Sequence, residues 1–272
     1  MRIVAVGECT RDRYLDHGGE TVGGISLNYA VNARRAGAET VALVSCTGTD
    51  AGGTAVRDLL AREDVDAGHL HQRPGATATQ AVRLVHGERI FPPGGYHPGV
   101  LADFHLNDAD RAFIAGFDVV AAPCFRQLAH LFDVAMDAAR PGAIRVADLL
   151  DGADLGPDLA GIDPLLAWLD LVFVSGDELT VDRLLPRSAA SRALIVVTEG
   201  EGGSVALANG RPIREPAVPV PAAERIDTNG CGDAFQAAFT VSWFRDRHIE
   251  RALRAGALQA SRVIRHLGAV GR

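Results

Sequence analysis

Short runs of apolar, mostly β-branched residues alternate with helix-forming stretches along most of this 272-residue chain. The first run is Arg2–Val6, and a helical pattern over residues 25–36 separates it from the next run at 40–45. Further strands are expected at residues 117–122, 144–147, 171–175 and 194–198, with helical patterns between most of them. Parallel strands need such crossovers, so the alternation predicts an α/β fold: a doubly wound, mostly parallel sheet with helices on both faces. No linker or repeat divides the chain, and we expect a single domain over residues 1–272.

Residues 69–98 break this rhythm. Strand-like runs at 77–86 and 89–91 flank a turn at His86-Gly87-Glu88, and the sequence PPGG at 92–95 ends them. No helix fits between the two runs. We therefore expect a small antiparallel β lid beside the main sheet, formed by about residues 12–20 and 69–98.

The composition excludes several kinds of chemistry. All 27 basic residues are arginine, so the chain has no lysine for a P-loop, for the strand lysine of protein kinases or for a Schiff base. The formal net charge is −7 and no basic run is present, which argues against a nucleic-acid partner. Any charged contact to a substrate's anionic group must come from arginine.

The cysteines and the N-terminal segment bear on the cellular compartment. The four cysteines have no CxxC spacing, which favours a reduced cytosolic protein over a disulfide framework or a zinc ribbon. The apolar run near the N-terminus is too short for a signal peptide or a membrane span. We expect a cytoplasmic protein with no membrane partner.

The most informative motif is DTNGCGD at residues 227–233, directly before an apolar helical stretch. Two glycines in such a turn let backbone N–H groups converge on an anion at a helix N-terminus. Asp233 lies in the first turn, where a carboxylate can take the proton of an attacking hydroxyl. The same residues also fit an ordinary turn followed by a capped helix, with Asp233 as a plain N-terminal acid.

This motif resembles the D-T-x-G-A-G-D signature of the ribokinase (PfkB-type) family of sugar kinases. Four more segments resemble family motifs in the same order: Gly7 with Asp12, Gly23-Gly24 with Asn28, Gly48-Thr49-Asp50 with Gly53, and Thr198 with Gly200 and Gly203. The resemblance spans nearly the whole chain. It implies an ATP-dependent kinase that phosphorylates a primary hydroxyl of a sugar or sugar-amine conjugate, with Mg²⁺ bridging the phosphates.

The resemblance also implies roles for individual residues. Asp233 would be the base, and the backbone N–H groups of Gly230, Cys231 and Gly232 would form the anion hole. The sugar would lie against Asp12, Gly23, Gly24 and Asn28, and ATP against Thr198, Gly200, Gly203, Asp227 and Thr228. Glu178 would hold Mg²⁺ indirectly, through water. Arg89, on the expected lid, is a further candidate for substrate contact.

Within the family, residues 89–91, 99–104 and the opening Gly7–Tyr14 segment are similar to those of fructoselysine 6-kinases. Two alternatives stay open: a nucleoside or other small-alcohol kinase of the same fold, and a non-catalytic sugar- or nucleotide-binding protein. A monovalent cation and a homodimer formed through the lid are also open.

Two positions depart from the family pattern. Ser175 stands where the family often has the asparagine of N-x-x-E, which bears on metal handling. Cys231 replaces the usual alanine, and a thiol at a helix N-terminus would have a lowered pKa and be sensitive to oxidation.

Overall fold

A nine-stranded sheet forms the centre of the molecule in the computed structural model, which describes residues 1–16 and 18–271. Its strand order is β14-β13-β12-β11-β10-β9-β1-β4-β5, and every pairing from β5 through β12 is parallel. β13 and β14 add two antiparallel pairings at one edge. The strands are β1 (Arg2–Val6), β4 (Thr40–Gly48), β5 (Leu70–Arg73), β9 (Val119–Pro123), β10 (Ile144–Asp148), β11 (Leu171–Ser175), β12 (Leu194–Thr198), β13 (Ser204–Ala208) and β14 (Arg211–Glu215).

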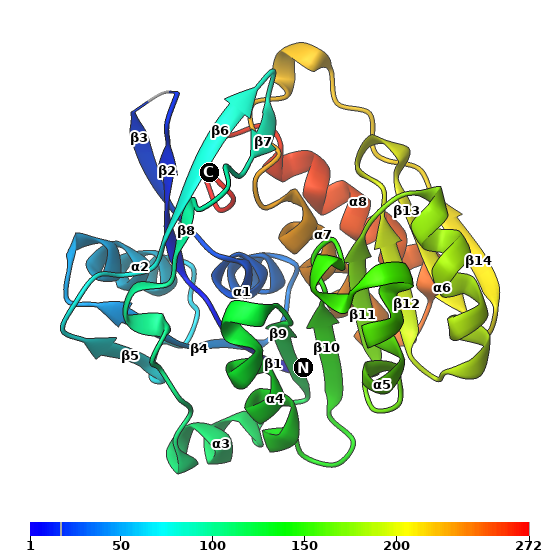
Figure 1. Ribbon diagram of the computed structural model, residues 1–272, viewed down its shortest axis with the longest axis horizontal. Helices are drawn as coiled ribbons and strands as arrows, with labels where there is room; N and C mark the ends of the chain where they lie inside the picture. Colours follow the sequence, from blue (N-terminus) through cyan, green and yellow to red (C-terminus); the bar gives the residue numbers. More distant parts are fainter. Residues whose placement is uncertain (17, 272) are drawn as a thin grey trace.

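Helices cover both faces of this sheet (Figure 1). On one face pack α1 (Ile25–Arg35), α2 (Ala51–Arg62), α7 (Cys231–Asp246) and α8 (Ile249–Val263). On the other pack α3 (Asp108–Ile114), α4 (Ala129–Ala138), α5 (Asp163–Leu166) and α6 (Glu178–Ala190). Strand β1 shows why: Ile3 and Ala5 point into one core, and Val4 and Val6 point into the other. The doubly wound α/β fold is confirmed.

The lid is a separate five-stranded sheet with β2 (Thr10–Tyr14), β3 (Gly19–Gly23), β6 (Thr79–Val85), β7 (Glu88–Ile90) and β8 (Tyr96–His97). It stands beyond the main sheet at the top of the view in Figure 1. Most of its pairings are antiparallel, as expected, but β2 and β6 run parallel. Residue 17, inside the expected lid segment 12–20, lies outside the described residues.

The expected extent of the lid needs one correction. Residues 69–98 were assigned to it, but β5 pairs in parallel with β4 and belongs to the main sheet. Leu70 is buried in the core on the α1 side, and this apolar anchor keeps the strand there. Among the residues described, no helix is long and apolar enough to cross a membrane.

Candidate active site

Acidic side chains gather where the parallel strands end. Glu8 lies two residues beyond the end of β1, and Asp148 is the last residue of β10. The order in which strands are added to the sheet reverses at β1, because β4 pairs on one side of β1 and β9 pairs on the other. Open α/β sheets bind ligands at such a switch point, outside the carboxyl ends of the strands.

The N-terminus of α7 faces this edge. Gly230 is its N-cap residue in the left-handed conformation (φ 78°), and a Cβ there would lie 2.1 Å from the Cβ of Ala269. At Gly232 nothing lies within 4 Å of the place a Cβ would take. The open space at Gly232 and the helix dipole make this turn suitable for a phosphate group.

Asp233, in the first turn of α7, is held by a residue distant in sequence. Asn28 Nδ2, on α1, donates a hydrogen bond of 2.7 Å to Asp233 Oδ2. Burial, with a smaller contribution from nearby Asp148, raises the pKa of Asp233 to about 7. Arg89 acts in the opposite direction, as does the Asn28 bond. A carboxyl group with such a pKa can both accept and release a proton near neutral pH.

Asp12 approaches the same site from lid strand β2. It is buried and accepts hydrogen bonds from Thr10 Oγ1 (2.7 Å) and Asn229 Nδ2 (2.8 Å). Gly23, across the β2–β3 pair, makes room for it, since a Cβ there would lie 2.2 Å from Asp12 Oδ2. Gly24 has a positive φ of 103° and packs on the backbone of Cys9 and Thr10. The glycine pair therefore positions Asp12 through close packing.

A cavity of about 680 Å³ opens on the other side of the α7 N-terminus. Thr198, Gly200 and Gly203 border it from the turn after β12, and Ser175 from the end of β11. Glu88 and Arg89 close it from the lid. Its apolar wall, suited to a flat aromatic ring, consists of Val218, Val220, Ala257, Ala260 and Ile264. An apolar wall and an anion-binding turn in one cavity fit a nucleotide.

Comparisons with known proteins agree with this geometry. Residues 2–271 match the pfkB family carbohydrate kinases. The chain is 30% identical to the fructoselysine 6-kinase of Escherichia coli strain K12 over 270 residues, 98% of each chain. The chain belongs to the pfkB family of carbohydrate kinases.

Solved structures show the same fold. The adenosine kinase of Sinorhizobium meliloti aligns over 99% of this chain and 95% of its own, with a TM-score of 0.84 and 18% identity. The ribokinase of Arabidopsis thaliana, complexed with ribose and ATP, aligns over 99% and 94% with a TM-score of 0.78 and 20% identity. These likenesses support the ribokinase-like fold expected from the sequence.

Most of the residues that were expected to bind the nucleotide lie at the border of the cavity. Thr198, Gly200, Gly203 and Thr228 do so. Thr228 also fastens the lid, because its Oγ1 accepts from the Arg89 N–H (2.9 Å) and its own N–H donates to Gly87 O (2.9 Å).

Asp227 differs from its expected role in ATP binding. Its side chain is fully buried and accepts from Tyr14 Oη (2.5 Å), the Asn229 N–H (2.8 Å) and the Gly268 N–H (2.9 Å). It does not border the cavity. Asp227 thus fixes the pfkB motif to the lid strand β2 and to the C-terminal segment.

Glu178 and Cys231 also depart from expectation. Glu178, at the start of α6, does not border the cavity and pairs with Arg214 Nη2 at 2.6 Å. Cys231 does border the cavity, but burial raises the pKa of its thiol to about 12. The expected lowering of that pKa is wrong, because desolvation outweighs the helix dipole. Its backbone N–H donates to Thr228 O at 3.3 Å.

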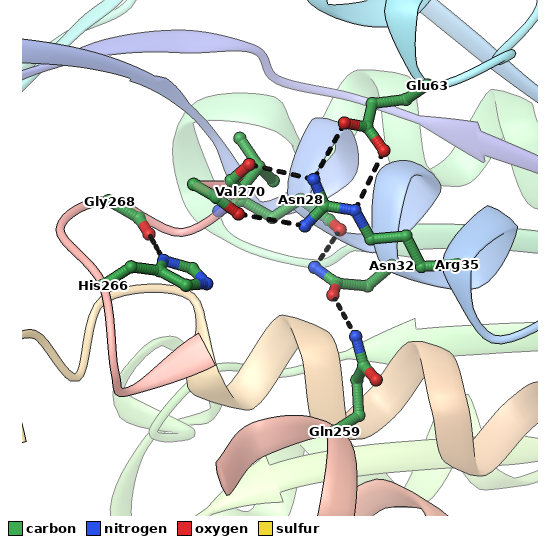
Figure 2. A network of polar contacts seen from close by, with 9 residues as sticks. Asn28, Asn32, Arg35, Glu63, Gln259, His266, Gly268 and Val270 are labelled. Atoms are coloured by element: carbon green, nitrogen blue, oxygen red, sulfur yellow. Dashed lines mark hydrogen bonds and ion pairs between the residues drawn. The ribbon is translucent and has the colours of Figure 1, made fainter. Parts of the chain in front are cut away.

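A polar network connects the site to the C-terminal segment (Figure 2). Asn28 O accepts from Asn32 Nδ2, and Asn32 Oδ1 accepts from Gln259 Nε2 on α8, both at 2.9 Å. Arg35, further along α1, donates to Val270 O at 3.1 Å and forms a two-bond ion pair with Glu63. These bonds fix α1, and with it Asn28, relative to α8.

Two acids of the site, Glu8 and Asp148, were not among the expected residues. Both are at least nine-tenths buried and lie at the ends of predicted parallel strands. The rule that ligands bind at the carboxyl ends of such strands was the signal that could have identified them.

Proposed function

We propose that this chain transfers the γ-phosphoryl group of ATP to a primary hydroxyl of a sugar-amine conjugate such as fructoselysine. The observation that carries the proposal is the position of Asp233. Its carboxylate lies at the α7 N-terminus, held by Asn28, between the nucleotide-sized cavity and the acid-lined end of the sheet. The fructoselysine 6-kinase relative, matched over nearly its whole length, supports the substrate class.

In this mechanism Asp233 accepts the proton of the substrate hydroxyl. The hydroxyl oxygen attacks the γ-phosphorus in line, and ADP leaves. The N–H groups at Gly230 and Gly232, with the dipole of α7, stabilise the charge that develops on the phosphoryl oxygens, and the Cys231 N–H joins them once it leaves Thr228 O. Mg²⁺ on the ATP phosphates would supply further charge neutralisation. Asp12 and Asn28 orient the sugar, Arg89 closes the lid over it, and water is excluded.

Glu178 would assist with the metal only through water, after separation from Arg214. Few protein oxygens would contact the Mg²⁺, so oxygens of the phosphates and of water would be most of its ligands, which is the coordination that this ion prefers.

The Asp233→Asn variant tests the base. Loss of a general base lowers kcat about 10²–10⁴-fold, and we expect that loss with ATP affinity retained. ADP release by a coupled assay measures turnover, and calorimetric titration measures ATP binding. Turnover within a few-fold of wild type would contradict the role of Asp233.

A substrate screen tests the reaction itself. Fructoselysine, fructose, ribose and adenosine are compared by kcat/KM in the same ADP-release assay. We expect fructoselysine to lead. Higher kcat/KM with adenosine would support a nucleoside kinase instead, and no ADP above background with any alcohol would contradict a kinase.

A further inference from the structure

Glu8 is a buried acid that the fold leaves without a cationic partner. Its side chain is 7% exposed, and Oε1 accepts the Ile25 N–H at the start of α1 at 3.3 Å. The Tyr96 hydroxyl, from lid strand β8, is a further neutral donor, and no arginine among the described residues forms an ion pair with Glu8. A buried carboxylate with only neutral donors is costly, and a cationic ligand would offset that cost.

A second buried group near Glu8 has an atom without a partner. The Asn28 side chain uses Nδ2 on Asp233, while its Oδ1 is buried with no partner in the described structure. Glu8 follows β1, Asn28 lies on α1 and Tyr96 lies on the lid, so polar groups from three parts of the fold meet here.

The charge around Glu8 is negative. Burial is the largest influence on the pKa of Glu8, which is raised to about 7; the hydrogen bonds from Ile25 and Tyr96 oppose the shift, and the charges of Asp12 and Asp148 add to it. Asp233 is also close enough to respond to Glu8. The positive charge of Arg89 partly offsets the charges of Asp12, Asp148 and Asp233, so one arginine interacts with three acids. A neutral sugar would leave this excess unbalanced, whereas a cationic group would offset it.

A metal ion fits the site less well than an organic cation. Within the described residues, three ligand atoms close enough together for a metal occur only at His69, His71 and Asp110. His71 lies on β5, His69 directly precedes that strand and Asp110 lies on α3, so this cluster is separate from Glu8. Within the described residues the acids around Glu8 form no such cluster, so a cation carried on a larger molecule suits them better.

We propose that Glu8 forms a subsite for a protonated amine carried by the sugar substrate. The inference rests on the proposed kinase function and adds the residue that selects the amine. An alkylammonium group is a compact cation with N–H donors, and it would pair with Oε2 of Glu8 while the sugar hydroxyls engage Asn28 and Asp12. The subsite thus distinguishes an aminated ketose from the parent ketose.

The test uses two substrates that differ in one group, 1-amino-1-deoxyfructose and fructose. Wild type is expected to show a higher kcat/KM with the amine. Glu8→Gln keeps the size but removes the charge and replaces one acceptor oxygen by an NH2 donor, so we expect the ratio of the two kcat/KM values to fall at least tenfold. Glu8→Asp, which retains the charge, is the matched control and should keep the preference for the amine.

The outcomes separate this inference from the proposed function. Turnover of both sugars with an unchanged ratio in Glu8→Gln overturns the subsite and leaves the kinase standing. No turnover of any sugar by wild type overturns the kinase, and the subsite with it.

A second measurement needs only the wild-type protein, in case the Gln variant does not fold. Calorimetric binding of the amine is compared with that of its neutral N-acetyl derivative, 1-acetamido-1-deoxyfructose, which should bind at least tenfold more weakly. Equal affinity for the two would overturn the subsite.

Discussion

At the scale of single residues, the carboxyl groups of the site are shaped by desolvation. Burial is the largest influence on Glu8, Asp12 and Asp233, and it raises each pKa, to about 7, 6 and 7. In water these groups would be fully ionised and weakly basic at neutral pH. Their shared burial at the end of the sheet makes Asp233 a stronger base than an exposed aspartate.

This shift sets a pH dependence for turnover. Asp233 must be ionised to accept a proton, and its pKa is raised to about 7, so kcat/KM should rise as the pH increases through about 7. Asp148→Asn removes a neighbouring charge that raises this pKa, and the rise should move to lower pH. The measurement is a pH profile of kcat/KM for both proteins.

The control for this prediction is Asp137→Asn, an exposed acid on α4. Its profile should match that of wild type. An identical midpoint in the Asp148→Asn variant would show that Asp233 does not govern the rise.

At the scale of elements, the turn before α7 depends on the C-terminal segment. The Gly268 N–H donates to Asp227, and the Ile226 and Asp227 N–H groups donate to Ile264 O at 2.8 and 3.2 Å. Ala269 packs directly against Gly230. The turn proposed to bind phosphate is therefore held from outside by residues that come after α8.

Two glycine substitutions separate structure from function in this turn. At Gly230, an alanine would incur about 1–2 kcal/mol for the left-handed backbone. Its Cβ would also overlap Ala269. We expect Gly230→Ala to lower Tm by at least about 4 °C. Gly232→Ala meets no neighbour, so it should keep Tm but lower kcat/KM by obstructing the phosphate.

Thermal unfolding by circular dichroism and the ADP-release assay measure the two effects. An equal fall in Tm for Gly230→Ala and Gly232→Ala would contradict the different roles assigned to the two glycines.

Strand β5 and helix α3 are joined by a buried carboxylate. Asp110 Oδ1 accepts from His69 Nδ1 (2.7 Å) and His71 Nε2 (2.8 Å), while Oδ2 accepts from the Asn107 N–H in a capping box. These bonds lower the pKa of Asp110 despite its burial. The alternating histidines thus serve to attach the edge strand to the helix beneath it.

At the scale of the whole molecule, the lid exposes more apolar surface than a solvated sheet needs. Leu15, Val85, Ile90 and Phe91 are each 45–49% exposed, and all four lie on or next to lid strands. The sheet also ends in open edges at β3 and β7. We propose that two copies of the chain pair through their lids and cover this surface.

Val85→Glu should weaken this dimer at least tenfold, because the new charge would be buried in the interface. Leu179→Glu is the matched control, since Leu179 is 53% exposed on α6, away from the lid. Light scattering coupled to size exclusion measures the mass over a concentration series. A monomeric wild type, or equal dissociation by both variants, would contradict the proposal.

The sequence predicted the elements well where the local signal was strong. The strands Leu171–Ser175 and Leu194–Thr198 were expected at the places where the structure has them, and the helical stretch expected at the DTNGCGD motif is α7. It assigned β5 to the lid because a short strand carries no sign of its partner. The buried role of Asp227 was equally hidden, since its donors are Tyr14, Asn229 and Gly268.

The sequence by itself determined the α/β class, the lid and the glycine turn before α7, because hydrophobic period and glycine spacing act over a few residues. Only the tertiary structure decided the chemistry of the site. Asn28 meets Asp233 across 205 positions of the chain, and Glu8 and Asp148 reach the same space from different strands. Their pKa values depend on desolvation and on charges that packing brings together, and no local pattern encodes those distances.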